Sequence, residues 1–326
     1  MKKVILSQTK RKLEMNSKLL EYLKNNKVFK LVCGAGNENE EEVEKLVELY
    51  SKAGCNIFDV SANLEVLKAA KRGLKKAGIS ENRFICVSVG IKGDPHLNKA
   101  NIDLEKCKGC LKCFSVCPQS AISSKCVVDE AKCIGCSKCQ RVCIADAIEM
   151  KSYPTDLATV LPEIIEEGVD CLEFHAITDD ENEVDEKWQL LNSLYNGVLS
   201  ICVDRAKLSN EALVKRLNRM LAIREPYTTI IQADGAPMSG GKDDYRTTLQ
   251  AVATAELLQK ENLPVFTLLS GGTNSKTSQL ATQCGVEFTG VAIGSYARYI
   301  VKDYLCGKMS FGEALKIARN LVDSVY

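Results

Sequence analysis

The feature that most constrains this chain is a run of cysteines that occurs twice at one spacing. The first copy reads CKGCLKCFSVCPQSAI from Cys107, and the second reads CIGCSKCQRVCIADAI from Cys133. Each copy follows C-x2-C-x2-C-x3-C, the spacing with which bacterial ferredoxins bind [4Fe–4S] clusters. Gly109 and Gly135 let the backbone come close to the inorganic sulfurs. The duplication therefore predicts two four-iron clusters.

In a two-cluster ferredoxin the fourth cysteine of each run binds the cluster of the other run. For cluster A the predicted ligands are Cys107, Cys110, Cys113 and Cys143. For cluster B they are Cys133, Cys136, Cys139 and Cys117. A pair of four-cysteine zinc sites is the alternative, but zinc modules usually place a longer spacer between two C-x2-C pairs. Ile144 replaces the usual proline after the second run, which should loosen a turn without removing a ligand.

The other eight cysteines need a different explanation. Disulfides are typical of short secreted chains, whereas this chain has 326 residues and begins without a secretory signal. Several of the eight lie in apolar runs, so we expect them to be small buried side chains. They are Cys33, Cys55, Cys86, Cys126, Cys171, Cys202, Cys284 and Cys306.

Charge and hydropathy exclude some classes of partner. The net charge is +1, which gives no reason to expect nucleic acid or an acidic membrane surface as a partner. No run of about 18 apolar residues is present to form a membrane helix. We expect a cytoplasmic protein.

Outside the cysteine runs, short β-rich stretches alternate with amphipathic helical stretches. Eight strands are expected, in VFKLVCGAG, CNIFDVS, RFICVSVG, VDCLEFHA, VLSICVDR, YTTIIQADG, PVFTLLSGG and GVAIGS. Eight strands each followed by a helix predict an α/β fold, a (β/α)8 barrel of the TIM type, with an open doubly wound sheet as the alternative. The barrel would be formed by residues 1–98 and 152–326, and residues 99–151 would be a ferredoxin module inserted after the third strand. Short strands in AISS and AIEM would close that module.

Ligands of such barrels bind at the carboxyl ends of the strands, and the module is inserted in one of the loops at that end. We therefore expect the clusters to lie over the barrel mouth. The loops LLSGGTNSKT and VAIGSYAR close the last two strands, and their glycines would let backbone N–H groups bind a phosphate at a helix N-terminus. The predicted phosphate-binding residues are Gly271, Gly272, Thr273, Gly294, Ser295 and Arg298. The alternative is that these glycines only form tight turns.

Three further side chains are candidates for acid–base chemistry. Glu173 and His175 alternate along one strand, so both should face the same side and could transfer a proton. Asp234 lies in the predicted long loop from Gln232 to Asp244, which could act as a lid or be an ordinary surface loop. A structural role is the alternative for His175. The remaining polar residues, Asp59, Asp204 and Arg205, are expected to form salt bridges, and His96 to be part of a loop.

Three loops, QADGAPMSGG, LLSGGTNSKT and VAIGSYAR, follow a two-cluster ferredoxin run in this order. Together they resemble the LdpA family of iron–sulfur proteins, best known from cyanobacteria, where it is linked to light- and redox-dependent input to the circadian clock. The resemblance implies a soluble protein that holds two [4Fe–4S] clusters and responds to redox state. It implies no substrate and no clock function for this chain.

Two functions fit these observations. In the first, the protein is an iron–sulfur electron carrier or redox sensor that meets a redox partner protein and holds a phosphate-bearing ligand. In the second, it is a flavin-dependent oxidoreductase in which the clusters feed electrons to FMN in the barrel. Radical chemistry on S-adenosylmethionine would need a C-x3-C-x2-C run, which this sequence lacks.

Overall fold

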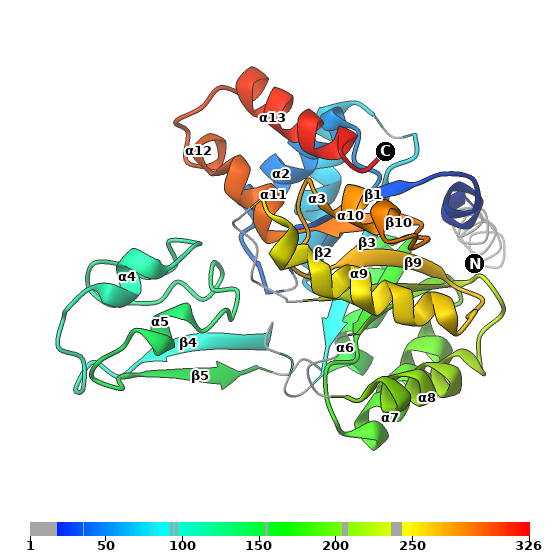
Figure 1. Ribbon diagram of the computed structural model, residues 1–326. Helices are drawn as coiled ribbons and strands as arrows, with labels where there is room; N and C mark the ends of the chain where they lie inside the picture. Colours follow the sequence, from blue (N-terminus) through cyan, green and yellow to red (C-terminus); the bar gives the residue numbers. More distant parts are fainter. Residues whose placement is uncertain are drawn as a thin grey trace, which may run out of the picture.

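The main sheet is a closed barrel of parallel strands. The computed structural model describes residues 18–34, 36–79, 81–91, 94, 97–153, 156–203, 208–235 and 243–326. Around the barrel the strand order is β1-β10-β9-β8-β7-β6-β3-β2 (Figure 1). The strands are β1 (Val28–Val32), β2 (Ile57–Ser61), β3 (Phe84–Gly90), β6 (Cys171–His175), β7 (Val198–Val203), β8 (Thr229–Asp234), β9 (Phe266–Ser270) and β10 (Gly290–Ile293). Each lies in one of the eight predicted runs, so the barrel is confirmed and the open sheet was the wrong alternative.

Helices surround the barrel, and most of them pack apolar side chains against the sheet or against a neighbouring helix. They are α2 (Glu40–Ala53), α3 (Leu64–Ala77), α6 (Leu157–Glu167), α7 (Glu181–Leu194), α8 (Asn210–Leu221), α9 (Tyr245–Lys260), α10 (Thr277–Gln283), α11 (Ser295–Ile300), α12 (Lys302–Leu305) and α13 (Phe311–Asp323). Side chains near the first residue cap the amino ends of helices. At α2 the Asn39 side chain accepts from the N–H of Glu42, and at α13 Ser310 forms a capping box with Glu313. Gly54 ends α2 in the left-handed conformation.

The barrel interior changes from apolar to polar along the strands. At the amino ends the inward residues are apolar, and Leu19 and Leu23 of the helical segment 18–25 pack against them. Two residues further along six of the eight strands, the next inward layer is polar. This buried layer contains Lys30, Asp59, Ser88, Glu173, Ser200 and Gln232. Function is therefore expected at the carboxyl ends, where the polar layers begin.

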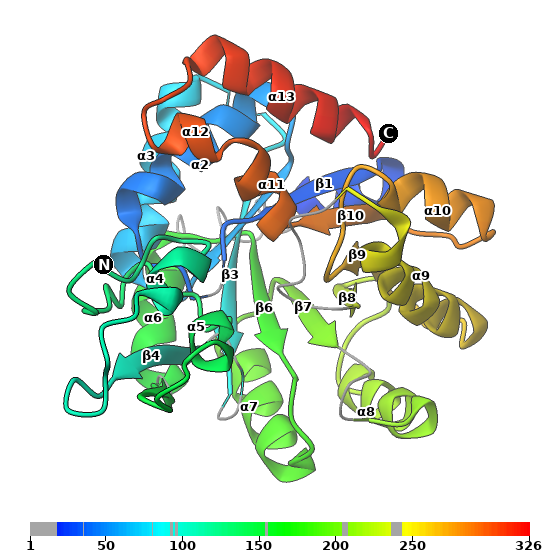
Figure 2. The ribbon, with the colours of Figure 1, turned by 60° about the vertical axis from the view of Figure 1, so that its left-hand side comes forward.

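The cysteine runs lie outside the barrel sheet. Strand β3 pairs directly with β6, so the chain between them leaves the barrel and returns. Residues 98–152, which we call the cysteine segment, contain α4 (Lys112–Val116) and α5 (Lys138–Arg141). Its strands β4 (Asn98–Ile102) and β5 (Ile148–Ser152) pair antiparallel and stand to one side of the barrel (Figures 1 and 2). The strand predicted in AIEM is confirmed as part of β5, whereas AISS contributes only a single bridge from Ile122 to Val128.

Six of the eight scattered cysteines are buried, as expected, but Cys284 and Cys306 are exposed. Each of these two follows the last residue of a short helix, α10 or α12, where the backbone turns away from the core. The prediction of burial was wrong for them. In the described part of the chain, no helix combines the length and apolar character needed to cross a membrane.

Two helical glycines offer a matched test of the packing between α2 and α3. A Cβ on Gly73 of α3 would lie 2.6 Å from the carbonyl oxygen of Glu44 on α2, whereas a Cβ on Gly312 of α13 would meet nothing within 4 Å. We expect Gly73→Ala to lower the free energy of unfolding by about 1–3 kcal/mol through overpacking. Gly312→Ala should raise it by up to about 1 kcal/mol through helix propensity. Denaturant titration of both variants measures this, and equal shifts would contradict the close approach of the two helices.

Candidate functional site

A buried ammonium group connects four strands inside the barrel. Lys30 Nζ of β1 lies 2.5 Å from Glu173 Oε2 of β6 and 2.9 Å from Asp59 Oδ2 of β2. It also donates to Gln232 Oε1 of β8 at 2.9 Å. All four side chains are at most 3% exposed. Sequence reasoning treated Lys30 as an ordinary strand residue, so this contact was missed. The predicted salt bridge of Asp59 is present, but its partner lies inside the barrel.

Hydrogen bonds extend this network toward the barrel mouth. Ser200 donates to Glu173 Oε2 at 2.7 Å, and Gln232 donates to Glu173 Oε1 at 3.1 Å. His175 Nε2 lies 3.4 Å from Glu173 Oε1, while its Nδ1 lies 2.9 Å from Asp94 Oδ2. The predicted shared face of Glu173 and His175 is therefore seen, although their role as a proton-transfer pair stays a prediction.

The network sets the charge of its members. Burial disfavours the Lys30 ammonium, but Asp59 and Glu173 outweigh that penalty and hold the pKa of Lys30 well above its ordinary value. Burial raises the pKa of Asp59 to about 6 although Lys30 opposes it. Glu173 has a lowered pKa because Lys30 and His175 overcome its burial. Burial also works against the His175 imidazolium, yet Asp94 and Glu173 raise the pKa of His175 well above its ordinary value.

Three of these buried groups are of metal-binding types. Glu173, His175 and Cys202 each bring one ligand atom within 4.8 Å of the others. Lys30 and Asp94 already supply close charged partners to Glu173 and His175, so the cluster is explained as a hydrogen-bonded ion network. We assign no metal to it.

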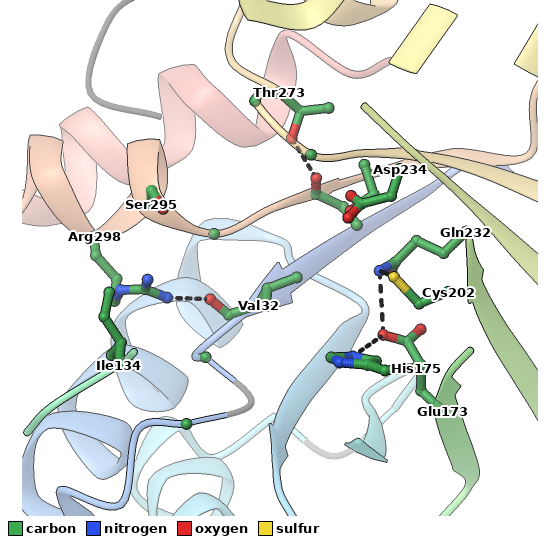
Figure 3. A pocket seen from close by; sticks show the side chains of 17 residues that line it. Val32, Ile134, Glu173, His175, Cys202, Gln232, Asp234, Thr273, Ser295 and Arg298 are labelled. Atoms are coloured by element: carbon green, nitrogen blue, oxygen red, sulfur yellow. Dashed lines mark hydrogen bonds and ion pairs between the residues drawn. The ribbon is translucent and has the colours of Figure 1, made fainter. Parts of the chain in front are cut away.

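A pocket of about 80 Å³ lies above this network at the barrel mouth. Every predicted phosphate-binding residue lines it: Gly271, Gly272, Thr273, Gly294, Ser295 and Arg298. The three acid–base candidates, Glu173, His175 and Asp234, line it too. Figure 3 shows Glu173, His175 and Gln232 at one end of the pocket and Arg298 with Ile134 at the other. Thr273 is held in place by its hydrogen bond to the carbonyl oxygen of Ala292.

Arg298 is a buried cation with little compensation. Its side chain projects from α11, the residue is 7% exposed, and Nη1 donates to the carbonyl oxygen of Val32 at 2.6 Å. Within the described chain it forms no ion pair with a carboxylate. Burial lowers the pKa of Arg298, with Glu42 acting in the opposite direction. A buried charge of this kind is costly, and an anion in the pocket would offset the cost.

The cysteine segment contacts the barrel at this pocket. Ile134 lies in the loop between Cys133 and Cys136, and its side chain lines the pocket beside Arg298. Lys99 of β4 is 8% exposed and donates to the carbonyl oxygens of Gly36 at 2.8 Å and of Cys133 at 2.9 Å. One ammonium group therefore ties the second cysteine run to the loop after β1. The sequence contained no signal for this role of Lys99.

The predicted cluster B cysteines converge. Cys117, Cys133, Cys136 and Cys139 all line one small cavity whose exposed lining is apolar. The backbone N–H of Ala100 points at Cys133 Sγ at 3.4 Å, and that of Ala121 points at Cys117 Sγ at 3.3 Å. Four sulfurs around an apolar space with N–H donors are the surroundings that a [4Fe–4S] cluster needs. These residues fit the cluster.

The two runs have the same backbone geometry. Gly109 and Gly135 both have positive φ, at 64° and 71°, as do Leu111 and Ser137 at 58° and 56°. In the first run Ala121 N–H lies 3.3 Å from Cys117 Sγ, and in the second Ala147 N–H lies 3.3 Å from Cys143 Sγ. The sequence repeat is thus also a structural repeat. Around the first run, Cys110 is exposed, while the scattered Cys126 is buried.

Some predicted positions lie outside the described residues. These are His96, Asp204, Arg205 and residues 236–242 of the predicted lid loop.

The fold and the cysteine geometry define a class of protein, a (β/α)8 barrel with a ferredoxin-type iron–sulfur segment. Residues 163–321 match the family model for the light dependent period A C-terminal domain, and residues 100–123 match that for a 4Fe-4S binding domain. Light dependent period A of Synechococcus elongatus is 30% identical over 292 residues, covering 86% of this chain and 82% of the relative. The chain belongs to the light dependent period A (LdpA) family, and it is an iron–sulfur protein.

Solved structures with similar architecture are distant in sequence. A tryptophan synthase from Mycobacterium tuberculosis has a TM-score of 0.48 and 10% identity, with coverage of 94% of this chain and 96% of that chain. The tryptophan synthase alpha subunit of Legionella pneumophila has a TM-score of 0.46 and 13% identity, with coverage of 95% and 96%. The barrel itself is established by the strand pairing.

The raised pKa of His175 predicts how stability depends on pH. Above about pH 6.5 the unfolded chain loses the histidine proton, while the folded chain keeps it. Stability contributed by His175 is therefore fully present below that pH and falls as the pH rises toward the folded pKa, by up to about 1.4 kcal/mol per pH unit. We expect His175→Gln to be less stable at pH 6 and to show a flatter decline above it. Denaturant titrations across pH measure this, and parallel curves would refute the charged state of His175.

Proposed function

We propose that this protein carries two [4Fe–4S] clusters and transfers or senses electrons, with a phosphate-bearing ligand bound at the barrel mouth. The observation that carries the proposal is the position of Ile134. This side chain belongs to the cluster B loop, yet it lines the same pocket as the glycine-rich loops and Arg298. Binding of a ligand would therefore change the surroundings of cluster B. In return, the oxidation state of cluster B would affect how the ligand binds.

The predicted ligands of the two clusters differ in their exposure to solvent. This difference supports the entry of electrons at cluster A. Cluster A has the exposed ligand Cys110, and the neighbouring Leu104 and Phe114 are large apolar side chains that are 62% and 46% exposed. Exposed apolar side chains beside a redox centre suit docking of a partner protein. The predicted cluster B loop, in contrast, contacts the barrel through Lys99 and Ile134. We infer that a redox partner protein meets cluster A and that cluster B serves the pocket.

Arg298 and the glycines support a phosphate as the bound group. Backbone at Gly271 and Gly272 has φ of 72° and 77°, a conformation that side chains rarely adopt. A Cβ at Gly271 would lie 2.3 Å from Asp234 Oδ1, so this loop has no room for a larger residue. The buried Arg298 guanidinium, which forms no ion pair with a carboxylate among the described residues, adds the positive charge that a phosphate needs.

Iron content tests the two clusters and their crossed ligands. Anaerobically purified protein should contain about eight irons, four for each cluster. The double variant Cys117→Ser, Cys133→Ser should keep about four irons, because both residues are assigned to cluster B. Loss of nearly all iron would show that the two cysteines serve different clusters. Cys284→Ser, which removes an exposed scattered cysteine, is the control and should keep the full content.

Phosphate binding tests the barrel site separately. Gly272→Val should abolish binding of inorganic phosphate while both clusters stay loaded, because the side chain would enter the pocket. The matched control is Gly285→Val, since Gly285 has a similar φ of 68° but lies away from the pocket. Calorimetric titration of cluster-loaded protein measures the affinity. Equal phosphate affinity in wild type and Gly272→Val would refute the site.

A further inference from the structure

A groove lies between the cysteine segment and the barrel helices, directly beside cluster B. Its volume is about 670 Å³, compared with about 80 Å³ for the barrel pocket. One wall contains the cluster B cysteines Cys117 and Cys136, and the opposite wall is formed by α2, α11 and α12. Organic ligands usually occupy clefts of about 300–1,000 Å³. The groove is in that range, and the barrel pocket is well below it.

The groove and the barrel pocket meet at a few shared residues. Ile134, Ser295 and Arg298 line both. The buried Arg298 side chain therefore lies at the junction of the two spaces. A phosphate bound by Arg298 could carry the rest of its molecule into the groove as readily as into the barrel.

The groove has an excess of positive charge. Lys138 of α5 and Lys302 of α12 line it, and within the described chain neither pairs with a carboxylate. Lys302 instead lies over the ring of Tyr299, 4.9 Å from its centroid, and Tyr299 is 50% exposed in the groove. Two lysines and an accessible aromatic ring suit a planar, anionic ligand.

We propose that the groove binds a flavin mononucleotide, with its phosphate at Arg298 and its ring between Tyr299 and the cluster B cysteines. This inference rests on the phosphate site proposed above and names its ligand. Iron–sulfur clusters give up one electron at a time, and flavins are cofactors that can accept electrons singly. The ring lies in the groove and not inside the barrel, because the barrel pocket is too small for it.

The redox step balances with the groups proposed. Each of the two reduced clusters gives up one electron, and water supplies one proton. Two electrons and one proton convert the oxidised ring to its anionic reduced form, whose negative charge Lys138 and Lys302 would stabilise. A low-potential one-electron donor protein, meeting cluster A, restores both clusters.

Binding of FMN to cluster-loaded protein tests the inference. Anaerobic titration, followed by the loss of FMN fluorescence and by equilibrium dialysis, gives the dissociation constant. We expect Lys138→Glu and Lys302→Glu each to weaken FMN binding at least tenfold. Lys308→Glu, an exposed lysine outside the groove, should leave it unchanged.

The outcomes separate this inference from the function on which it rests. Normal FMN binding in both lysine variants would overturn the groove site, because both side chains line the groove. Binding of inorganic phosphate without binding of FMN would overturn the flavin and leave the phosphate site intact. Failure of both probes to bind wild-type protein would overturn the phosphate site as well.

Discussion

The barrel depends on one buried ammonium group. Lys30 contacts Asp59 on β2, Glu173 on β6 and Gln232 on β8, so it joins strands from opposite sides of the closed sheet. Removing one partner of such a buried set leaves an uncompensated charge, which typically costs about 3–5 kcal/mol. The same contacts place Glu173 and His175 at the floor of the pocket. Stability and site geometry are therefore carried by the same side chains.

The second constraint is where the chain leaves the barrel. The cysteine segment follows the carboxyl end of β3 and precedes α6, so it leaves the barrel at the end where barrel ligands bind. Lys99 then fixes the second cysteine run against the loop after β1. The second cysteine run is therefore in contact with the barrel pocket, because Ile134 of that run and Arg298 both line it. An iron–sulfur segment attached elsewhere on the barrel would have no such contact with the pocket.

Local sequence patterns predicted most of the fold. They failed for residues whose pairing or burial depends on contacts with parts of the chain that are distant in sequence. All eight strands and the strand in AIEM were found from alternation and β-rich runs. The strand β4 was missed because NKANI has no clear pattern of its own and is a strand only through pairing with β5. Cys284 and Cys306 were expected to be buried from their residue type alone, but each lies where a helix ends at the surface. Lys30 was overlooked because a lysine in a strand normally faces solvent.

The sequence by itself determined the cluster chemistry and the barrel, because both depend on short-range spacing. Cysteines at every third residue are spaced to bind one iron–sulfur cluster. A strand followed by a helix is the repeating unit from which the barrel is built. The tertiary structure alone decided which side chains meet. Lys30 and Glu173 are 143 residues apart, and Arg298 and Val32 are 266 apart. Closure of the barrel brings these pairs together, and it leaves the buried Arg298 side chain lining the pocket at the mouth.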